Sequence, residues 1–329
     1  MSPKLSIAIP TYNRSQFLQG ALDRLFASDA ILDAQIEIVI SDNASTDNTE
    51  DIVHSASEKY GKEIHYFRNE KNLGIDGNIH QVVNRSSGEY VWMLSDDDVI
   101  ADNAIDYVLN KINQQNFCFH FLNAKPLNLE GKTSKVIDTD QDIITTDNNI
   151  FIEKIWVWAT FISSFLFKRE HWINIHNRED YIGTDIYLTY TLYALLANNP
   201  SEKKIIGSTP IILIRSQYTG SYRIFYAFGY QWFKLLTETA VQMGFDRSCL
   251  KRIARKSILR DLIFRVYSAK LNSTASLSIE NIRNLTRYTY AIPIAWLTLY
   301  PILIFPISII KFTKRIFGKI GIKPSSHFK

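Results

Sequence analysis

Three consecutive carboxylates, Asp96 to Asp98, directly follow the apolar run from Tyr90 to Leu94. Adjacent like charges repel one another and lose hydration when they are partly buried, so this cluster at a strand end favours a bound divalent cation. Hard oxygen ligands suit Mg²⁺ or Mn²⁺, which proteins commonly bind through one or two carboxylates and the phosphates of a substrate. The alternative is a solvated turn that caps a helix beginning near Ala101, because aspartate is a common cap residue.

Alternating strands and helices in the first 115 residues must position these carboxylates. Strands are expected at residues 5–9, 36–40, 64–67 and 90–94, with Pro10 ending the first. Helical patterns fall between them, at residues 17–25, around 52–53 and at 79–83. This alternation predicts an α/β fold with a mainly parallel sheet flanked by helices.

A polar segment lies after each expected strand, at Pro10–Asn13, Asp42–Asn43, Asn72–Gly74 and Asp96–Asp98. Ligands of open α/β sheets bind outside the carboxyl ends of the strands, so these segments are predicted to line one cleft. Two interpretations stay open for some of them. Asp42 could shape an Asx-turn or cap a helix, and Asn72 and Gly74 could form only a turn, although glycine also lets a backbone approach a phosphate.

The rest of the chain differs in composition. Further strands are expected at residues 117–122, 205–206 and 211–214, a polar loop at 138–149, and a basic helical region at 224–288. Cys118 and Cys249 have no metal-ligand spacing, which favours a reduced, cytosolic setting, and no signal peptide is expected before the first strand. The net charge of +4 is uneven, because the tail from Lys311 has six Lys or Arg and no acid. Such a tail favours an anionic surface as partner.

Residues 288–310 form an uncharged, apolar segment that contains Pro293, Pro301 and Pro306. A segment of this length can span a bilayer, which takes about 20 residues, but each proline interrupts helical hydrogen bonding. The basic tail favours the cytoplasm. We therefore expect peripheral or hairpin attachment to an anionic membrane surface, on the cytoplasmic face of the bacterial inner membrane. A helix buried in the core is the alternative.

Five segments, in this order and spacing, resemble the family 2 glycosyltransferases, which are inverting enzymes with the GT-A fold. They are residues 6–14, 41–47, 72–74, 88–98 and Gly183-Thr184-Asp185. The resemblance extends from Leu5 to about Tyr190. The segments at 41–47 and 96–98 are most similar to the branch that adds sugars to bacterial surface polysaccharides, including abequosyltransferase-like enzymes.

The resemblance implies a site for the nucleotide sugar. Its residues would be Pro10, Tyr12, Asn13, Asp42, Asn72, Gly74 and Asp96. In this site Tyr12 would stack on the base, Asp42 would accept a hydrogen bond from a base N–H, and Asp96 would bind the ribose.

The resemblance also implies that Asp97 binds Mn²⁺ or Mg²⁺, a metal that Asp98 could share. Asp185 matches the catalytic base, although a helix N-cap is the competing interpretation. A cation offsets charge on the leaving diphosphate, and the base takes the proton of the acceptor hydroxyl. Two departures from the family are Ser95, where many members have aspartate, and Thr184, where an acid usually precedes the base.

The predicted function is therefore metal-dependent, inverting transfer of one sugar from a nucleotide-diphosphate sugar to a glycan, lipid-linked acceptor in O-antigen or capsule assembly, without nucleic acid. Transfer of a single sugar is favoured because the Gln-x-x-Arg-Trp motif of processive synthases is missing. A sugar nucleotidyltransferase is the first alternative, but residues 10–14 contain no glycine for a triphosphate loop. An inactive glycan-binding or scaffold protein is the second, and Asp42, Asp97 and Asp185 argue against it.

The expected domains follow from these patterns. Residues 1–220 form the GT-A catalytic domain, with a nucleotide-binding half (1–115) and an acceptor-binding half (116–220). Residues 221–288 form the helical basic region, and residues 289–329 the apolar membrane-associating segment with its basic tail.

Overall fold

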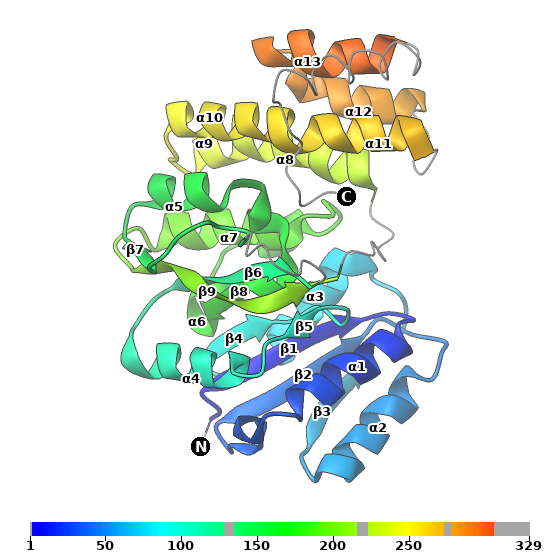
Figure 1. Cartoon of the computed structure of the whole chain (residues 1–329), viewed down its shortest axis with the longest axis vertical. Helices are drawn as coiled ribbons and strands as arrows, with labels where there is room; N and C mark the ends of the chain where they lie inside the picture. Colours follow the sequence, from blue (N-terminus) through cyan, green and yellow to red (C-terminus); the bar gives the residue numbers. More distant parts are fainter. Residues whose placement is uncertain (1, 128–134, 216–222, 273–277, 306–329) are drawn as a thin grey trace. The chain divides into compact units, whose positions relative to one another are not determined.

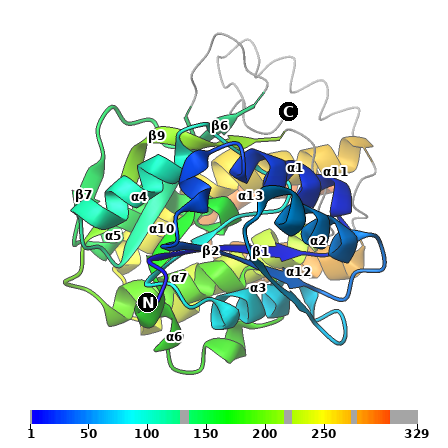
Figure 2. The same cartoon turned by 90° about the horizontal axis from the view of Figure 1, so that it is seen from below.

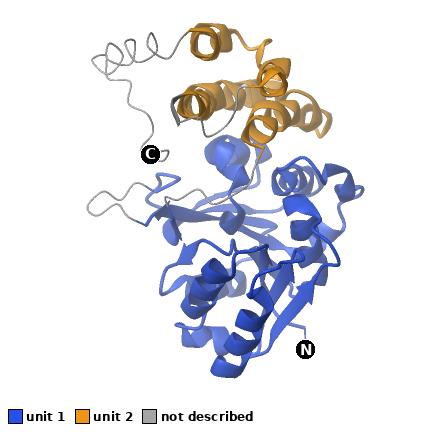
Figure 3. Ribbon diagram, turned by 90° about the vertical axis from the view of Figure 1, so that its right-hand side faces the viewer, with its two compact units in different colours: residues 1–219 blue, residues 220–329 orange. Residues whose placement is uncertain are grey.

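The computed structural model describes residues 2–127, 135–215, 223–272 and 278–305 (Figure 1). The chain divides into two compact units, residues 1–219 and 220–329 (Figure 3). The predicted division of the first region after residue 115, and that of the C-terminal region after residue 288, stay predictions.

The described part of the first unit contains one nine-stranded sheet. Its strands are β1 (Leu5–Thr11), β2 (Ile36–Asp42), β3 (Ile64–Arg68), β4 (Tyr90–Met93), β5 (Val99–Ile100), β6 (Phe119–Pro126), β7 (Ile143–Thr145), β8 (Phe165–Lys168) and β9 (Lys204–Ile214). Their order is β3-β2-β1-β4-β8-β6-β9-β5, and β7 pairs with β9. Strands β1 to β4 are parallel, whereas β8 runs antiparallel to both β4 and β6. The predicted α/β class is confirmed, and the sheet is mixed rather than mainly parallel because of β5, β7 and β8.

Helices cover both faces of this sheet. The α-helices are α1 (Ser15–Leu25), α2 (Thr49–Tyr60), α3 (Gly74–Arg85), α4 (Ala104–Gln114), α5 (Asn148–Ile155), α6 (Arg169–Ile173) and α7 (Tyr187–Asn198). Four short 3₁₀ helices are η1 (Asp29–Leu32), η2 (Trp156–Thr160), η3 (Ile162–Ser164) and η4 (Arg178–Tyr181). Figure 2 shows α1, α2 and α4 on one face, and α3, α6 and α7 on the other. Helix α1 buries Leu18, Leu22 and Leu25, as the 3.6-residue pattern predicts.

Strand β1 continues through Pro10, where the sequence predicts its end. Pro10 is opposite Ser41 of β2, whereas β4 ends at Met93, opposite Ala8. Leu94 donates its N–H to the Ala8 carbonyl, so the backbone N–H and C=O positions of Ala8, and of Pro10 two residues later, point toward the β4 side. Pro10 lies beyond the last residue pair of β1 and β4. The missing N–H of proline is therefore not needed there.

Gly88, which belongs to one of the family-like segments, has a packing role. Its N–H donates to Ser6 Oγ at 2.8 Å, and a Cβ at Gly88 would lie 2.6 Å from that oxygen. Ser6 and Ser87 both donate hydroxyl hydrogens to the buried Glu37. Burial alone would raise the pKa of Glu37, but these bonds lower it below its ordinary value. Gly88 thus joins β1, β2 and the start of β4 away from the predicted cleft.

The described part of the second unit is helical, which confirms the predicted helical C-terminal region. Its elements are η5 (Phe225–Gln231), α8 (Trp232–Lys234), η6 (Leu235–Thr239), α9 (Ala240–Gln242), α10 (Arg247–Ser257), η7 (Ile258–Leu262), α11 (Ile263–Asn272), α12 (Ile279–Thr289) and α13 (Pro293–Ile304). The elements η5, η6 and η7 are π-helices. None of the helices described here has both the length and the hydrophobicity to cross a membrane. The end of the apolar segment, residues 306–310, and the basic tail lie outside the described residues.

Candidate active site

Asp96 and Asp97 lie just beyond the carboxyl end of β4, and one guanidinium contacts both. Arg14 Nη1 is 2.9 Å from Asp96 Oδ1 and 3.2 Å from Asp97 Oδ2. Thr11 Oγ1 donates to the other Asp96 oxygen at 2.8 Å. The end of β1 and the start of α1 therefore hold the first two carboxylates of the triplet.

These two carboxylates differ in exposure. The side chain of Asp96 is 3% exposed, and that of Asp97 is 23% exposed. Burial raises the pKa of Asp96 to about 6, although the Arg14 charge and the Thr11 hydroxyl lower it. Asp96 is therefore a desolvated acceptor that depends on its donors, whereas Asp97 is accessible to a ligand.

Asp98 has a different partner. Ser163 of η3 donates its hydroxyl to Asp98 Oδ2 at 2.6 Å, and the Ser95 N–H donates to the same hydroxyl oxygen at 3.0 Å. Burial and the charges of Asp97 and Asp96 raise the pKa of Asp98 to about 7, although the Ser163 hydrogen bond lowers it. The predicted sharing of a metal by Asp98 stays a prediction.

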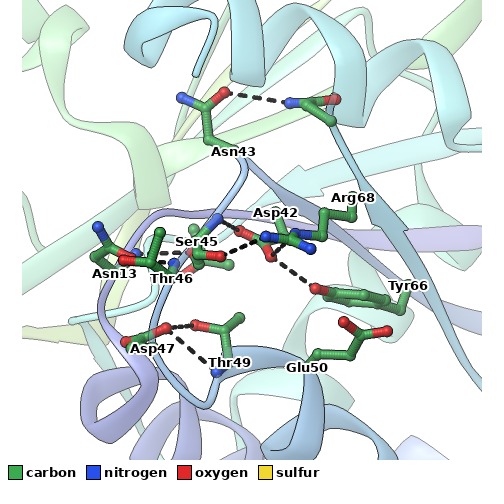
Figure 4. Close-up of polar contacts among 12 residues, drawn as sticks. Asn13, Asp42, Asn43, Ser45, Thr46, Asp47, Thr49, Glu50, Tyr66 and Arg68 are labelled. Atoms are coloured by element: carbon green, nitrogen blue, oxygen red, sulfur yellow. Dashed lines mark hydrogen bonds and ion pairs between the residues drawn. The ribbon is translucent and has the colours of Figure 1, made fainter. Parts of the chain in front are cut away.

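A polar pocket of about 180 Å³ lies at the ends of β2 and β3 (Figure 4). It is lined by Asp42, Ser45, Thr46, Asp47, Glu50, Tyr66 and Arg68. Asp42 Oδ1 accepts from the Ser45 N–H at 2.9 Å, which confirms its turn-shaping role. Its Oδ2 accepts from the Tyr66 hydroxyl at 2.6 Å, and Arg68 Nε is 3.7 Å away. The pocket thus combines a buried acceptor, a phenol and a half-exposed cation.

The loop after β1 borders this pocket. The Asn13 N–H donates to Ser45 Oγ at 2.8 Å, and Asn13 Oδ1 accepts from the Thr46 N–H at 2.7 Å (Figure 4). Asn13 has a left-handed φ of 51°, which asparagine tolerates better than most residues. Asn13 therefore connects the loop after β1 to the loop after β2 through two hydrogen bonds. Pro10 and the 41% exposed Tyr12 are not among the residues that line the pocket, and their contact with a base stays a prediction.

Asn72 and Gly74 form the turn that begins α3. Asn72 Oδ1 accepts from the Gly74 N–H and from Asn43 Nδ2, both at 2.8 Å. Gly74 has a φ of 73°, a conformation that favours glycine. The turn-shaping interpretation of both residues is confirmed, while their contact with a phosphate stays a prediction.

Asp185 lies between η4 and α7, with a left-handed φ of 61°. The N-cap position of α7 is Ile186, so Asp185 comes one residue before the cap. The Asp185 N–H donates to Asp76 Oδ2 of α3 at 2.8 Å. The half-buried Asp185 is thus held through its backbone by another carboxylate.

Sequence reasoning missed several residues of this region, namely Arg14, Tyr66, Arg68, Asp76 and Ser163. Tyr66 and Arg68 are two residues apart on β3, so strand periodicity gives a usable signal that they share a face. Asp76 and Ser163 offer no such signal, since their partners are 109 and 65 residues away.

The predicted metal-binding residues can be assessed by their donor chemistry. Within the described ranges, no group of three or more His, Cys, Asp or Glu side chains is arranged to hold a metal ion. Asp97 nevertheless offers carboxylate oxygens at a partly exposed position, and the Arg14 cation already contacts one of them. This donor set fits a divalent ion whose other ligands come from a diphosphate and water.

Known proteins are similar to the part of the chain that contains most of this site. The model of the family described as Glycosyl transferase family 2 matches residues 6–171. The chain is 28% identical over 223 residues to abequosyltransferase RfbV of Salmonella typhimurium. It is 29% identical over 199 residues to a GalNAc(5)-diNAcBac-PP-undecaprenol beta-1,3-glucosyltransferase of Campylobacter jejuni. These matches cover 64% and 58% of this chain, and 66% and 60% of the relatives, so each spans less than two thirds of the relative.

Solved structures share the fold. Residues 1–349 of S. aureus TarS, in complex with UDP-GlcNAc, superpose with a TM-score of 0.63 at 14% identity over 87% of this chain and 79% of that one. The mannosyltransferase PcManGT of Pyrobaculum calidifontis, in complex with GDP-Man and Mn²⁺, gives 0.56 at 14% identity over 90% and 88%.

Replacing Ser163 by alanine removes the hydroxyl that donates to the buried Asp98 carboxylate. We expect the free energy of unfolding to fall by about 1–3 kcal/mol, as for other buried groups that lose a partner. Ser164→Ala is the matched control, because the buried Ser164 hydroxyl has no hydrogen-bond partner among the described residues. Urea unfolding of the two variants measures the difference, and equal losses would contradict the role of Ser163.

Proposed function

Because the chain belongs to glycosyl transferase family 2, we propose that it transfers one sugar, with inversion, from a nucleotide-diphosphate sugar to a glycan in bacterial surface-polysaccharide assembly. The observation that carries the proposal is the contact of Arg14 with both Asp96 and Asp97. These residues lie at the carboxyl ends of the parallel strands, where the polar pocket also lies. The similarity to an abequosyltransferase and to a glucosyltransferase whose name includes an undecaprenol-linked glycan supports a lipid-linked acceptor.

The pocket at Asp42 would receive the nucleotide base. Its buried carboxylate accepts hydrogen bonds, and the neighbouring Arg68 supplies a donor and a positive charge. The exposed ring of Tyr12 is available to stack on a base, and Asp96 would bind the ribose. The UDP-GlcNAc complex of the TarS fragment supports a nucleotide sugar as the donor.

Asp97 would hold Mn²⁺ or Mg²⁺, and Asp98 could share it. When bound, the cation would offset the negative charge of the leaving diphosphate. The PcManGT complex with Mn²⁺ supports a divalent ion. Arg14, whose guanidinium contacts both Asp96 and Asp97, would add a positive charge to the same region.

Asp185 would act as the general base. It would accept the proton of the acceptor hydroxyl, whose oxygen forms the new bond to the anomeric carbon as the diphosphate leaves. The left-handed backbone of Asp185 supports this role, because sparsely populated conformations cluster at functional sites.

Removing the Asp97 carboxylate tests the proposed metal site and donor binding together. Calorimetry would compare the wild type with Asp97→Asn across UDP-, GDP-, CDP- and dTDP-sugars, with and without Mn²⁺. We expect Mn²⁺ to strengthen donor binding by wild type at least about tenfold, or about 1.4 kcal/mol, and to have little effect on the variant. Asp106→Asn, an exposed change on α4, is the control. Equal Mn²⁺ dependence in Asp97→Asn would contradict the assignment.

Replacing Asp185 by asparagine tests the proposed base. Loss of a general base typically lowers the rate about 10²–10⁴-fold, while donor affinity should stay within about twofold. The measurement is transfer of labelled sugar from the tightest-binding donor of the panel to polyprenol-linked glycans extracted from bacterial membranes. Asp180→Asn removes an exposed carboxylate of η4 as a control. A near-wild-type rate for Asp185→Asn would mean that the base lies elsewhere.

The C-terminal unit would attach the protein to the cytoplasmic face of the bacterial inner membrane. On α13 the side chains of Trp296, Leu297 and Ile304 are 60%, 77% and 75% exposed, and the helix has no charged residue. Arg283 and Arg287 of α12 are exposed in the same unit. Exposed apolar and aromatic side chains with nearby basic residues are typical of helices that lie in the plane of an anionic membrane surface.

Leu297→Glu tests this attachment. Burying one leucine contributes about 1.5–3 kcal/mol, so we expect binding to phosphatidylglycerol vesicles to weaken at least about tenfold. Gln242→Glu adds the same charge at an exposed position of α9 and serves as the control. Co-sedimentation with the vesicles gives the affinities. If Leu297→Glu bound like Gln242→Glu, α13 would not contact the membrane.

A further inference from the structure

Helix α7 is buried from Tyr187 to Leu196, so the N–H groups at its start need partners other than water. The N-cap position is Ile186, whose apolar side chain cannot accept a hydrogen bond. Just before it the chain turns sharply, with left-handed φ values of 92° at Gly183 and 61° at Asp185. An acceptor from elsewhere in the fold must therefore hold this turn.

Asp76 of α3 is that acceptor. Its Oδ2 accepts from the N–H groups of Gly183 at 2.9 Å and of Asp185 at 2.8 Å. Its Oδ1 accepts from the Tyr187 N–H at 3.2 Å. One carboxylate thus binds alternate N–H groups on both sides of Asp185 and caps α7 from another helix.

The electrostatic setting makes this an unusual choice of cap. Asp76 is 4% exposed, and burial together with the Asp185 charge raises its pKa to about 6, although the three N–H groups lower it. An exposed Ser or Asp next to a helix usually caps it without that burial. Here a buried charge is retained beside a second carboxylate.

Helix α3 also connects two parts of the candidate active site. Asp76 follows Gly74 by two residues. The side chain of Asn43, just after β2, donates to Asn72 and to the Gly74 carbonyl in the turn that begins α3. One turn later, His80 Nδ1 is 3.0 Å from the Tyr187 hydroxyl, a second contact between α3 and the start of α7. The loops next to the nucleotide pocket and the loop of Asp185 are therefore fixed to the same helix.

We propose that Asp76 is a positioning residue for sugar transfer: by binding the backbone around Asp185, it sets where that carboxylate stands relative to the donor loops. The inference rests on the proposed role of Asp185 as the base. Asp76 itself touches neither substrate nor metal in this scheme. Its substitution should therefore change the catalytic step and leave nucleotide binding intact.

Asp76→Asn is the informative variant, because its amide group can replace only one of the two acceptor oxygens and turns a donor toward a backbone N–H. Displacing a reacting group by about 1 Å can cost about 10²-fold in rate. We expect kcat for labelled-sugar transfer to fall about 10²-fold, with donor KM within about twofold. Asp147→Asn is the matched control, because Asp147 caps α5 through the N–H groups of Asn149 and Ile150. It makes the same chemical change at a helix cap of the same unit, where the amide oxygen can still accept both bonds, and should keep its kcat.

A double-mutant cycle separates positioning from plain loss of structure. If Asp76 acts through Asp185, Asp76→Asn should change kcat less than about twofold in the Asp185→Asn background. Equal losses in both backgrounds would overturn the inference and indicate a structural role. An impaired Asp185→Asn enzyme with an unimpaired Asp76→Asn enzyme would overturn this inference alone. A wild-type kcat for Asp185→Asn would overturn the proposed base, and this inference with it.

Should Asp76→Asn not fold, the cycle uses Asp76→Glu, which keeps the charge and moves both oxygens by one methylene. A kcat loss that disappears in the Asp185→Asn background supports the inference, and an unchanged kcat overturns it. Hydrogen exchange of the peptide over residues 181–190 adds a readout without substrate. Faster exchange there in the Asp76 variants than in Asp147→Asn supports the inference, and unchanged exchange overturns it.

Discussion

Buried negative charge at the carboxyl edge of the sheet is the constraint on which the rest of the site depends. Asp42, Asp76, Asp96 and Asp98 are all less than 9% exposed. A buried carboxylate without partners is strongly destabilising, so each must have donors. None of the four obtains all of them locally. The donors come from β1 and α1, from β3, from η3 and from the turn before α7, and the loops are therefore held together by the charges that they surround.

The first half of the fold could be predicted because its signals are local. The spacing of apolar residues and the positions of turn residues indicate β1 to β4 and the helices between them. Parallel strands then bring their carboxyl ends to one edge of the sheet. Strands β5, β7 and β8 have two to four residues each, too few for a period, and they exist because a neighbouring strand pairs with them. The prediction that Pro10 ends β1 failed for a related reason. Whether a proline fits in β1 depends on whether β4 needs its N–H, and β4 ends before it reaches Pro10.

Which residues gather at the edge could be predicted, but not what each side chain binds. Asn13, Asn72 and Gly74 are at the expected edge, yet the structure engages them in bonds that shape and join the loops. Sequence gives the type of a polar group but not the direction of its hydrogen bonds. The partner of Asp185 could not be predicted, because Asp76 lies 109 residues away in the sequence.

The hydrogen bond between Ser163 and Asp98, together with the contacts of Asp76, also bears on how the chain is made. During synthesis residues 1–115 leave the ribosome with the carboxylates of Asp76 and Asp98 before Ser163 and residues 183–187 have been added. Strand β4 likewise lacks β8, its neighbour on one side. Residues 1–115 therefore lack several partners of their buried carboxylates until residues 163–187 have been made. The carboxyl edge of the sheet is therefore completed only late in synthesis, when the segment from β8 to the start of α7 packs against the strands made first.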